Sequence, residues 1–271
     1  MIGAALLASL LWGTADFLAG RASRVHPAAM VALVGQAMGL TALALVLLVR
    51  GADGGAVAGG ALSGLFGAAA VLSFYRALAL GTMSIVAPIV ATSAIVPVLA
   101  GVLLDGERPG GLQWVGIAVA LTGVVLASRE HDGSTALDSA KAIRLALAAA
   151  VLIGCALVFL DAAAEHDALT GVGVARAVSV PILVVVALQA RARVPWRTVP
   201  SLAVIGLLDT GANTAFAIAT TGGLLSLVAV LGGLFPVVTV ALAYLLLHER
   251  LLGIQRTGVL LALAGIPLIS A

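Results

Sequence analysis

The chain has 271 residues, of which 62% are hydrophobic and only 10% are charged. Soluble domains carry roughly 25% charged residues, so this composition excludes a water-exposed globular domain. The formal net charge is only +2 and no basic stripe is present, which argues against a nucleic-acid-binding protein. Apolar runs of about 20 residues are typical of helices that cross a lipid bilayer.

Breaks at Gly, Pro and charge clusters divide the chain into ten apolar spans, each expected to be a transmembrane helix. In chain order they are 2–20, 28–49, 57–80, 84–104, 112–128, 143–160, 170–190, 198–220, 225–247 and 254–271. The first span lacks the basic start of a signal peptide, so it is interpreted as a membrane helix. The sequence therefore predicts an all-α, polytopic membrane protein that lies in the lipid bilayer.

A segment of the first half of the chain returns 142 residues later without a gap. GERPGGLQWVGIAVALTGVVLAS at 106–128 matches HERLLGIQRTGVLLALAGIPLIS at 248–270. The matching residues include the polar Glu107, Arg108 and Gln113 of the first segment. Such self-similarity indicates a duplication. We therefore expect a first five-helix repeat at 1–128, a polar linker at 129–142 and a second five-helix repeat at 143–271.

An odd number of spans in each repeat has a consequence for orientation. The second repeat must enter the membrane from the side opposite the first, which makes the two repeats inverted. This architecture is found in many secondary transporters, whose substrate site lies near the bilayer midplane between the repeats. Rocking one repeat against the other would then expose the site to each side in turn.

Several motifs resemble the EamA group of the drug/metabolite transporter superfamily. They are LLWGTADFLAGRASR (10–24), FYRALALGTMSIVAPIV (74–90) and the twin Gly-Glu-Arg and His-Glu-Arg segments. The resemblance covers the whole chain and follows the order of the family's helices. It implies ten helices and carrier-type transport of a small solute, usually export. It does not specify the solute, because the group handles amino acids, nucleotide-related metabolites and drugs.

Polar residues near the centres of the spans are candidates for a substrate or proton pathway. An ionisable residue inside a membrane helix costs about 2.5–3.5 kcal/mol on insertion scales. Asp209 and Arg176 lie near the centres of their spans, and Asn213 follows Asp209 by one helical turn. Gln36 lies in the second span at roughly the place of Arg176 in the seventh. The alternative is a structural ion pair between Arg176 and Asp209.

A second set of candidates lies near the ends of the first and third spans, which end on the same side of the membrane. Asp16 and Arg76 can meet there, with Trp12 and Tyr75 at similar depth. We expect these four residues to form one rim of the pathway. The alternative for Trp12 and Tyr75 is anchoring at the headgroups, and for Arg76 it is a side chain that reaches to the interface.

Prolines and glycines in the fourth and ninth spans are candidates for helix kinks or gating. They are Pro88, Pro97, Gly232, Gly233 and Pro236. Proline removes a backbone hydrogen bond and bends a helix. A static kink is the alternative. Glu107 and Arg108, with Glu249 and Arg250 in the second repeat, are expected to be structural, because an acid complements the dipole at a helix start.

Other functions have weaker support in the sequence. A zinc His-Glu-x-x-His pair and a Gly-x-Ser-x-Gly elbow are absent, which disfavours an intramembrane enzyme. A non-transporting scaffold or regulatory subunit explains the hydropathy but not the central polar residues. No phosphate-binding GxxxxGK[ST] loop is present, so direct use of ATP is not expected. Neither a cofactor nor a metal is expected.

The expected location is a bacterial-type inner membrane. Lys and Arg concentrate in the loops after odd-numbered spans, which places the termini outside by the positive-inside rule. The family resemblance implies cytoplasmic termini, so the sequence indicates only that both termini lie on one side. The expected partners are a small-molecule substrate and either no second subunit or one identical copy.

Overall fold

The structure is a computed structural model that describes residues 1–23, 25–80, 86, 89–127, 139–247 and 253–270. Within these ranges the ordered elements are helices, and no strand is present. They are α1 (Ile2–Ser23), α2 (Ala28–Arg50), α3 (Ala56–Leu80), the 3₁₀ turn η1 (Ala91–Ala94), α5 (Ile95–Leu103), α6 (Gly111–Ala127), α7 (Ser139–Gln189), the 3₁₀ turn η2 (Trp196–Thr198), α8 (Val199–Thr220), α9 (Leu225–Gly232), α10 (Phe235–Leu247) and α11 (Gly253–Ser270). Helices satisfy their own backbone hydrogen bonds, as a lipid environment requires.

Most of the described helices follow the predicted apolar spans, but α7 runs through the gap predicted between 160 and 170, and the fourth and ninth spans are interrupted. In the described part of the chain, seven helices are long and apolar enough to cross a membrane. α7 has 51 residues, far more than one crossing needs. Its backbone is extended at Asp167 (φ −158°, ψ 113°), so α7 consists of two helical segments that meet at this residue. The chain is a polytopic membrane protein.

Two predicted spans are interrupted rather than continuous. Instead of one continuous α-helix over 84–104, the described part of the fourth span has helical residues at 86, 89 and 90, then η1, then the short helix α5. The ninth span is divided into α9, which ends at Gly232, and α10, which begins at Phe235. Pro97 and Pro236 lie in the first turns of α5 and α10, where the missing N–H of proline costs no helical hydrogen bond.

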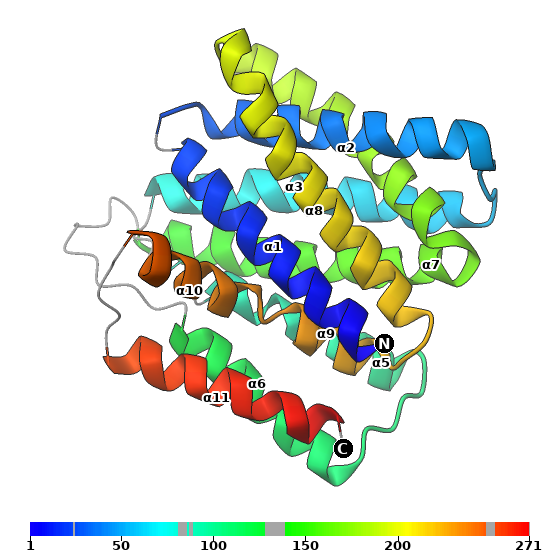
Figure 1. Cartoon of the computed structure of the whole chain (residues 1–271), viewed down its shortest axis with the longest axis vertical. Coiled ribbons are helices and arrows are strands. Elements are labelled where there is room, and N and C mark those ends of the chain that lie inside the picture. The colour runs from blue at the N-terminus through cyan, green and yellow to red at the C-terminus, as the bar shows by residue number, and fades with distance from the viewer. Residues whose placement is uncertain (24, 81–85, 87–88, 128–138, 248–252, 271) are drawn as a thin grey trace.

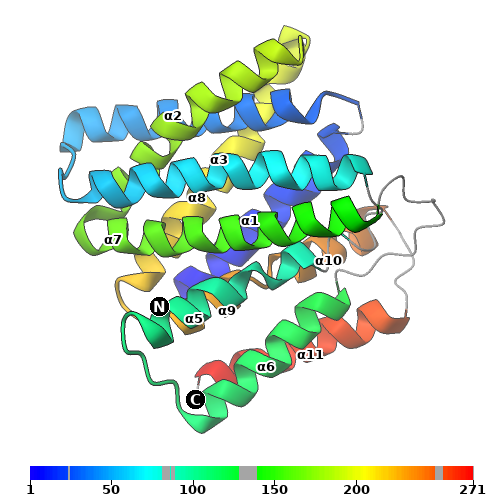
Figure 2. The ribbon, with the colours of Figure 1, turned by 180° about the vertical axis from the view of Figure 1, so that it is seen from behind.

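Most of the close packing joins helices from opposite halves of the chain. α3 packs along α7, α1 packs on α8 and α10, and α2 contacts both α7 and α8. α6 packs on α11, and Figure 1 shows this pair at one edge of the bundle, next to α10. The N- and C-termini lie at the same end of the molecule, as Figures 1 and 2 show from opposite sides.

α6 and α11 run antiparallel and touch through small residues. A side chain on Gly116 would lie 2.7 Å from the backbone nitrogen of Ile269, and one on Gly123 would collide with the backbone of Ala262. Residues later in α6 therefore contact residues earlier in α11, which is the arrangement of two antiparallel helices. Small residues let helix backbones approach closely, which is how helices associate in lipid without a hydrophobic driving force.

The same contacts recur with the two helices exchanged. A side chain on Gly258 would meet Ala127, and one on Gly265 would lie 2.7 Å from the Cβ of Ala120. Gly258 and Gly265 are the residues 142 positions after Gly116 and Gly123. The α6–α11 contact is therefore close to symmetric about a two-fold axis between the helices.

A second contact repeats at nearly the same offset. A side chain on Gly13 of α1 would collide with Val238 of α10, and one on Gly154 of α7 would collide with Val96 of α5. Val96 and Val238 are 142 residues apart, and Gly13 and Gly154 are 141 apart. The first helix of each half therefore packs on the interrupted helix of the other half in the same way.

Glu107, in the connection between α5 and α6, caps α9. Its carboxylate accepts hydrogen bonds from the backbone amides of Leu225 and Ser226, the second at 3.0 Å. These are N–H groups that a helix start leaves without intrahelical partners. The capped helix is thus not α6, which follows Glu107 in the sequence, but one from the other half of the chain. Glu249 and Arg250 lie outside the described residues.

Candidate functional site

Arg176 and Asp209 form an ion pair that joins the second segment of α7 to α8. The Nη2 atom of Arg176 donates a hydrogen bond to Oδ2 of Asp209 at 2.6 Å. The Arg176 side chain is 9% exposed and that of Asp209 is 34% exposed, so the guanidinium lies deeper than the carboxylate. Removing a charge from water costs several kcal/mol per ion, and pairing offsets that cost. The ion pair between Arg176 and Asp209, which the sequence offered as the alternative to a substrate or proton pathway, is therefore present in the structure.

Asn213 holds the other side of the Asp209 carboxyl group. Its Nδ2 donates to the backbone oxygen of Asp209 at 2.7 Å and approaches Oδ1 at 3.4 Å. The i, i+4 spacing on α8 produces this contact, as the sequence indicated. The orientation of the Asp209 carboxylate is therefore set from two sides, by Arg176 and by Asn213.

Gln36 of α2 is linked to the helix that carries Arg176. The hydroxyl of Ser179 donates a hydrogen bond to Oε1 of Gln36 and lies 3.3 Å from the backbone oxygen of Arg176. Ser179 is buried. The Nε of Arg176 is also buried, and it has no hydrogen-bond partner within the described ranges. α2 thus contributes a polar group beside the ion pair.

Asp16 adds a second carboxyl group to this region from α1. It is exposed although it lies within a helix that continues to Ser23. α1 packs on α8, the helix that carries Asp209. Among the described residues, no cationic side chain forms an ion pair with Asp16.

The structure does not bring Asp16 and Arg76 together. Arg76 is exposed near the end of α3, which packs on α7 rather than on α1. No ion pair joins the two residues, both of which are described. The prediction used only the depth of the two residues in the membrane. Two residues at the same depth can still lie on helices that are not neighbours, so depth alone could not predict a contact between Asp16 and Arg76. The side chain of Tyr75 and the whole of Pro88 lie outside the described residues.

Trp12 precedes Asp16 by one turn of α1 and belongs to an aromatic cluster inside the bundle. Its ring centroid is 5.6 Å from that of Phe216 on α8 and 6.3 Å from that of Phe235 at the start of α10. Phe216 is fully buried. Trp12 therefore packs between helices rather than anchoring at the headgroups. The cluster lies between the Asp16–Asp209 region and the end of the molecule that holds the termini.

The interruption between α9 and α10 abuts this aromatic cluster. A side chain on Gly232 would lie 3.3 Å from both Trp12 and Phe216. Gly233 and Leu234 separate α9 from α10, and Pro236 follows in the new helix. The predicted kink of the ninth span is thus a break in the helix beside Trp12.

Three residues of this region were not predicted from the sequence. Ser179 could have been found by its i, i+3 spacing from Arg176, since serine hydroxyls commonly hydrogen-bond between membrane helices. Phe216 and Phe235 carried no comparable signal, because single aromatic residues in apolar spans are ordinary. Their contact with Trp12 requires the tertiary arrangement of α1, α8 and α10.

The model of the EamA-like transporter family matches residues 1–129 and 140–271, which is nearly the whole chain. The chain belongs to the EamA-like transporter family. This membership makes it a membrane transporter of the drug/metabolite type and indicates a transporter rather than an enzyme.

Two further similarities agree with this family. An uncharacterized transporter in the cobO 3' region of Sinorhizobium sp. is 39% identical over 66 residues, which cover 24% of this chain and 47% of that protein. The match therefore spans about half the length of that relative. A solved crystal structure has a TM-score of 0.78 with 21% identity, covering 98% of this chain and 94% of the other. This likeness supports the fold of the transporter.

Proposed function

We propose that the chain is a secondary transporter that exports a small metabolite or drug by alternating access between two inverted repeats. The observation that carries this proposal is the polar group contributed by four helices, α1, α2, α7 and α8. It consists of Asp16, Gln36, Arg176, Asp209 and Asn213. Charged groups in an apolar bundle are costly and are retained mainly where they pair or line a substrate or ion pathway.

The inverted repeat is supported by the symmetric packing of small residues. In the α6–α11 contact, Gly116 and Gly258 lie in equivalent surroundings, and the two helices run antiparallel. Two repeats with opposite orientations place corresponding last helices antiparallel in this way. Five crossings in each repeat, with α7 contributing two, give the ten crossings of the proposal.

Alternating access follows from closing one end of the bundle while opening the other. The Trp12–Phe216–Phe235 cluster and the Glu107 cap on α9 both lie between the polar group and the end that holds the termini. In the proposed mechanism these contacts close that end of the bundle. The break between Gly232 and Phe235 is the proposed hinge, because it borders the cluster. Exchange or an ion gradient supplies the driving force.

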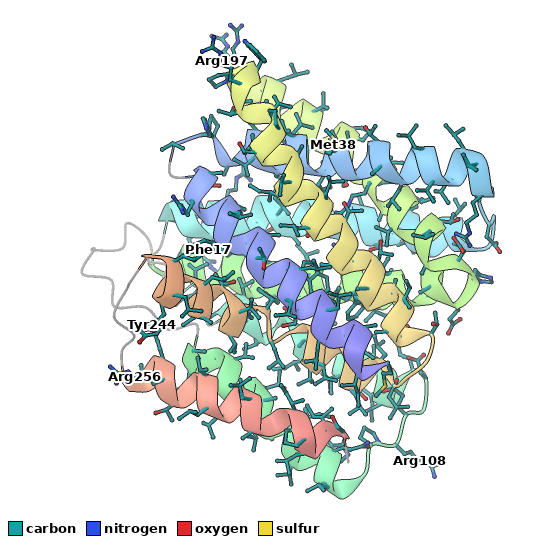
Figure 3. The ribbon with its side chains drawn as sticks, viewed as in Figure 1. Phe17, Met38, Arg108, Arg197, Tyr244 and Arg256 are labelled. Carbon is teal, nitrogen blue, oxygen red and sulfur yellow. The ribbon has the colours of Figure 1, made fainter. Side chains whose placement is uncertain are left out.

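The proposed location is a bacterial inner membrane, with one chain forming a complete site. Figure 3 shows Arg256 and Arg108 at opposite ends of the molecule. Arg197 lies in η2 and Arg256 in the first turn of α11, where Arg residues gather after odd-numbered spans, whereas Arg108 stands in a connection with little other positive charge.

Export can be tested by comparing metabolites in the medium of cells with and without the chain. A solute that is enriched outside only when the chain is expressed supports export and identifies the cargo. A solute depleted from the medium would replace export by import. No difference across a broad panel, with the protein in the membrane, would favour a non-transporting scaffold.

A further inference from the structure

We propose that the connection between α7 and α8 binds the anionic headgroups of membrane phospholipids. The proposed contact does not depend on which solute the chain carries. This α7–α8 connection, ARARVPWR at 190–197, holds three arginines and one tryptophan and no acidic residue. The nearest acidic residues along the chain are Asp167 before it and Asp209 after it. A basic segment directly at the end of a membrane helix is typical of contact with anionic lipid.

The three arginines of the α7–α8 connection are exposed and have no acidic partner among the described residues. They are Arg191, Arg193 and Arg197. In the first half of the chain, the connection between α2 and α3 differs, because Nη1 of Arg50 donates a hydrogen bond to Oδ1 of Asp167 at 3.1 Å. The positive charge of that connection is therefore neutralised within the protein. Guanidinium groups bind phosphate oxygens through two parallel hydrogen bonds, so a lipid phosphate is the matching partner for the unpaired arginines.

Arg191 has a backbone conformation that favours glycine. Its φ is 50°, and among the described residues it is the only one other than glycine with a positive φ. The amide of Arg191 donates to the oxygen of Leu188 and that of Ala192 to the oxygen of Ala187, both at 3.0 Å, which is a helix end that usually carries glycine. In the α2–α3 connection the residue with positive φ, 89°, is Gly51. An arginine held in this conformation without an acidic partner in the described structure points to a ligand outside the protein.

Trp196 places the α7–α8 connection at the boundary between the acyl chains and water. Its side chain is 77% exposed, and Cζ of Arg197 lies 5.7 Å from its ring centroid. Tryptophan favours the headgroup level of a membrane, and arginine can stack on an aromatic ring and still bind phosphate. Leu188 near the end of α7 and Val204 in α8 are exposed apolar side chains, as expected of surfaces that face lipid. Figure 3 shows Arg197 at the tip of the molecule.

Contacts with the bundle hold the α7–α8 connection in place. Val194 packs against a buried cluster that includes Val31 of α2 and Leu202 of α8. The hydroxyl of Thr198 donates a hydrogen bond to the backbone oxygen of Pro195 at 2.7 Å. A surface that is already ordered loses little conformational freedom when it binds a partner. The arginines are therefore presented to the membrane surface on a fixed support.

The test measures which lipid lies next to Trp196 in the full-length protein reconstituted in bilayers. Bromine atoms on an acyl chain quench tryptophan fluorescence only at short range. Mixtures of phosphatidylglycerol, which is anionic, and phosphatidylcholine are prepared with bromine on one lipid or on the other, and the quenching gives the relative binding constant of the two lipids. The signal of Trp196 is obtained by subtracting the spectrum of the Trp196→Phe variant, which retains Trp12 and Trp114.

Phosphatidylglycerol is expected to bind next to Trp196 at least about threefold more strongly than phosphatidylcholine at low ionic strength, because arginines attract an anionic membrane surface. Equal binding of the two lipids, or a preference for phosphatidylcholine, would overturn the proposal. The arginines would then be available to a soluble partner, such as an acidic protein, instead of a lipid.

Two double variants with the same change in net charge test whether the preference arises from this connection. Arg191→Gln combined with Arg193→Gln should lower it at least about twofold, and this variant keeps the arginine that stacks on the tryptophan ring. Arg108→Gln combined with Arg144→Gln, at exposed positions elsewhere, should leave it unchanged. All four arginines are exposed, so both variants are expected to fold. A preference that survives the first pair of changes, or that both pairs lower equally, would overturn the proposal.

Discussion

The Nη2 atom of Arg176 lies 2.6 Å from the Oδ2 atom of Asp209, and the two residues come from adjacent antiparallel elements 33 positions apart in the chain. The pair joins the second segment of α7 to α8 at a depth where charged groups are costly. Gln36 of α2 bonds to Ser179 on the same helix segment as Arg176, and α1, which carries Asp16, packs on α8. The Arg176–Asp209 ion pair is therefore expected to stabilise the helix bundle and is also part of the candidate site.

Removing one partner of this pair should destabilise the protein more than removing both. Arg176→Leu leaves the Asp209 charge uncompensated, at an expected cost of about 3 kcal/mol in the free energy of unfolding. Replacing both residues with leucine should recover most of that loss but not transport. Thermal unfolding of the purified variants in detergent measures the first effect. Single variants as stable as the wild type would show that the pair contributes nothing to the fold.

The Glu107 cap of α9 should be detectable as a local contribution to stability. Glu107→Ala leaves the amides of Leu225 and Ser226 without their acceptor, at an expected cost of about 1–3 kcal/mol. Glu107→Gln should cost less, because the amide oxygen still accepts. Arg108→Ala is the control, since Arg108 is exposed and a surface change is expected within about 0.5 kcal/mol. If all three variants unfold alike, the cap is not a stabilising contact.

Two glycine-to-alanine changes in helices should have opposite signs. At Gly123 of α6 the added methyl group collides with the backbone of Ala262, so Gly123→Ala should destabilise by about 1–3 kcal/mol. At Gly67 of α3 the added methyl group meets nothing within 4 Å, so Gly67→Ala should stabilise by roughly 0.5–1 kcal/mol. Midpoints of thermal unfolding compare the two. Equal shifts in one direction would contradict the close α6–α11 contact.

Replacing Trp12 should lower the stability of the protein more than replacing the exposed Trp196. Trp12→Ala removes its contacts with Phe216 and Phe235, at an expected cost of about 3–5 kcal/mol. Trp12→Phe keeps part of the cluster and should cost less. Trp196 is 77% exposed, so Trp196→Ala serves as the control. A Trp12→Ala protein that unfolds at the wild-type temperature would place Trp12 outside the packed core.

Hydropathy was sufficient to predict an all-helical membrane protein, because the requirement for apolar residues acts locally along the chain, and seven described helices are long and apolar enough to cross a membrane. The i, i+4 spacing likewise predicted that Asn213 would contact Asp209, since a helix fixes that geometry. The pairing of Arg176 with Asp209 could be proposed for the same reason that it forms, the high cost of an unpaired charge in a membrane.

The sequence did not predict which helices are neighbours in the bundle. Asp16 and Arg76 were expected on one side of the membrane, yet α3 packs on α7 whereas α1 packs on α8 and α10. The helix capped by Glu107 was also beyond local reasoning, because α9 is more than a hundred residues away. Contacts of this kind depend on which helix faces become neighbours, and apolar residues on every face of a membrane helix leave that choice open.

The central claim, that the polar group around Asp209 moves a solute across the membrane, is tested most directly by Asp209→Asn. Metabolites in the medium are compared for cells expressing the wild type, Asp209→Asn or the matched control Asp53→Asn, at equal amounts of folded protein in the membrane. We predict a solute enriched outside with the wild type and with Asp53→Asn, and not with Asp209→Asn. Equal enrichment with all three proteins would contradict the claim and remove Asp209 from the mechanism.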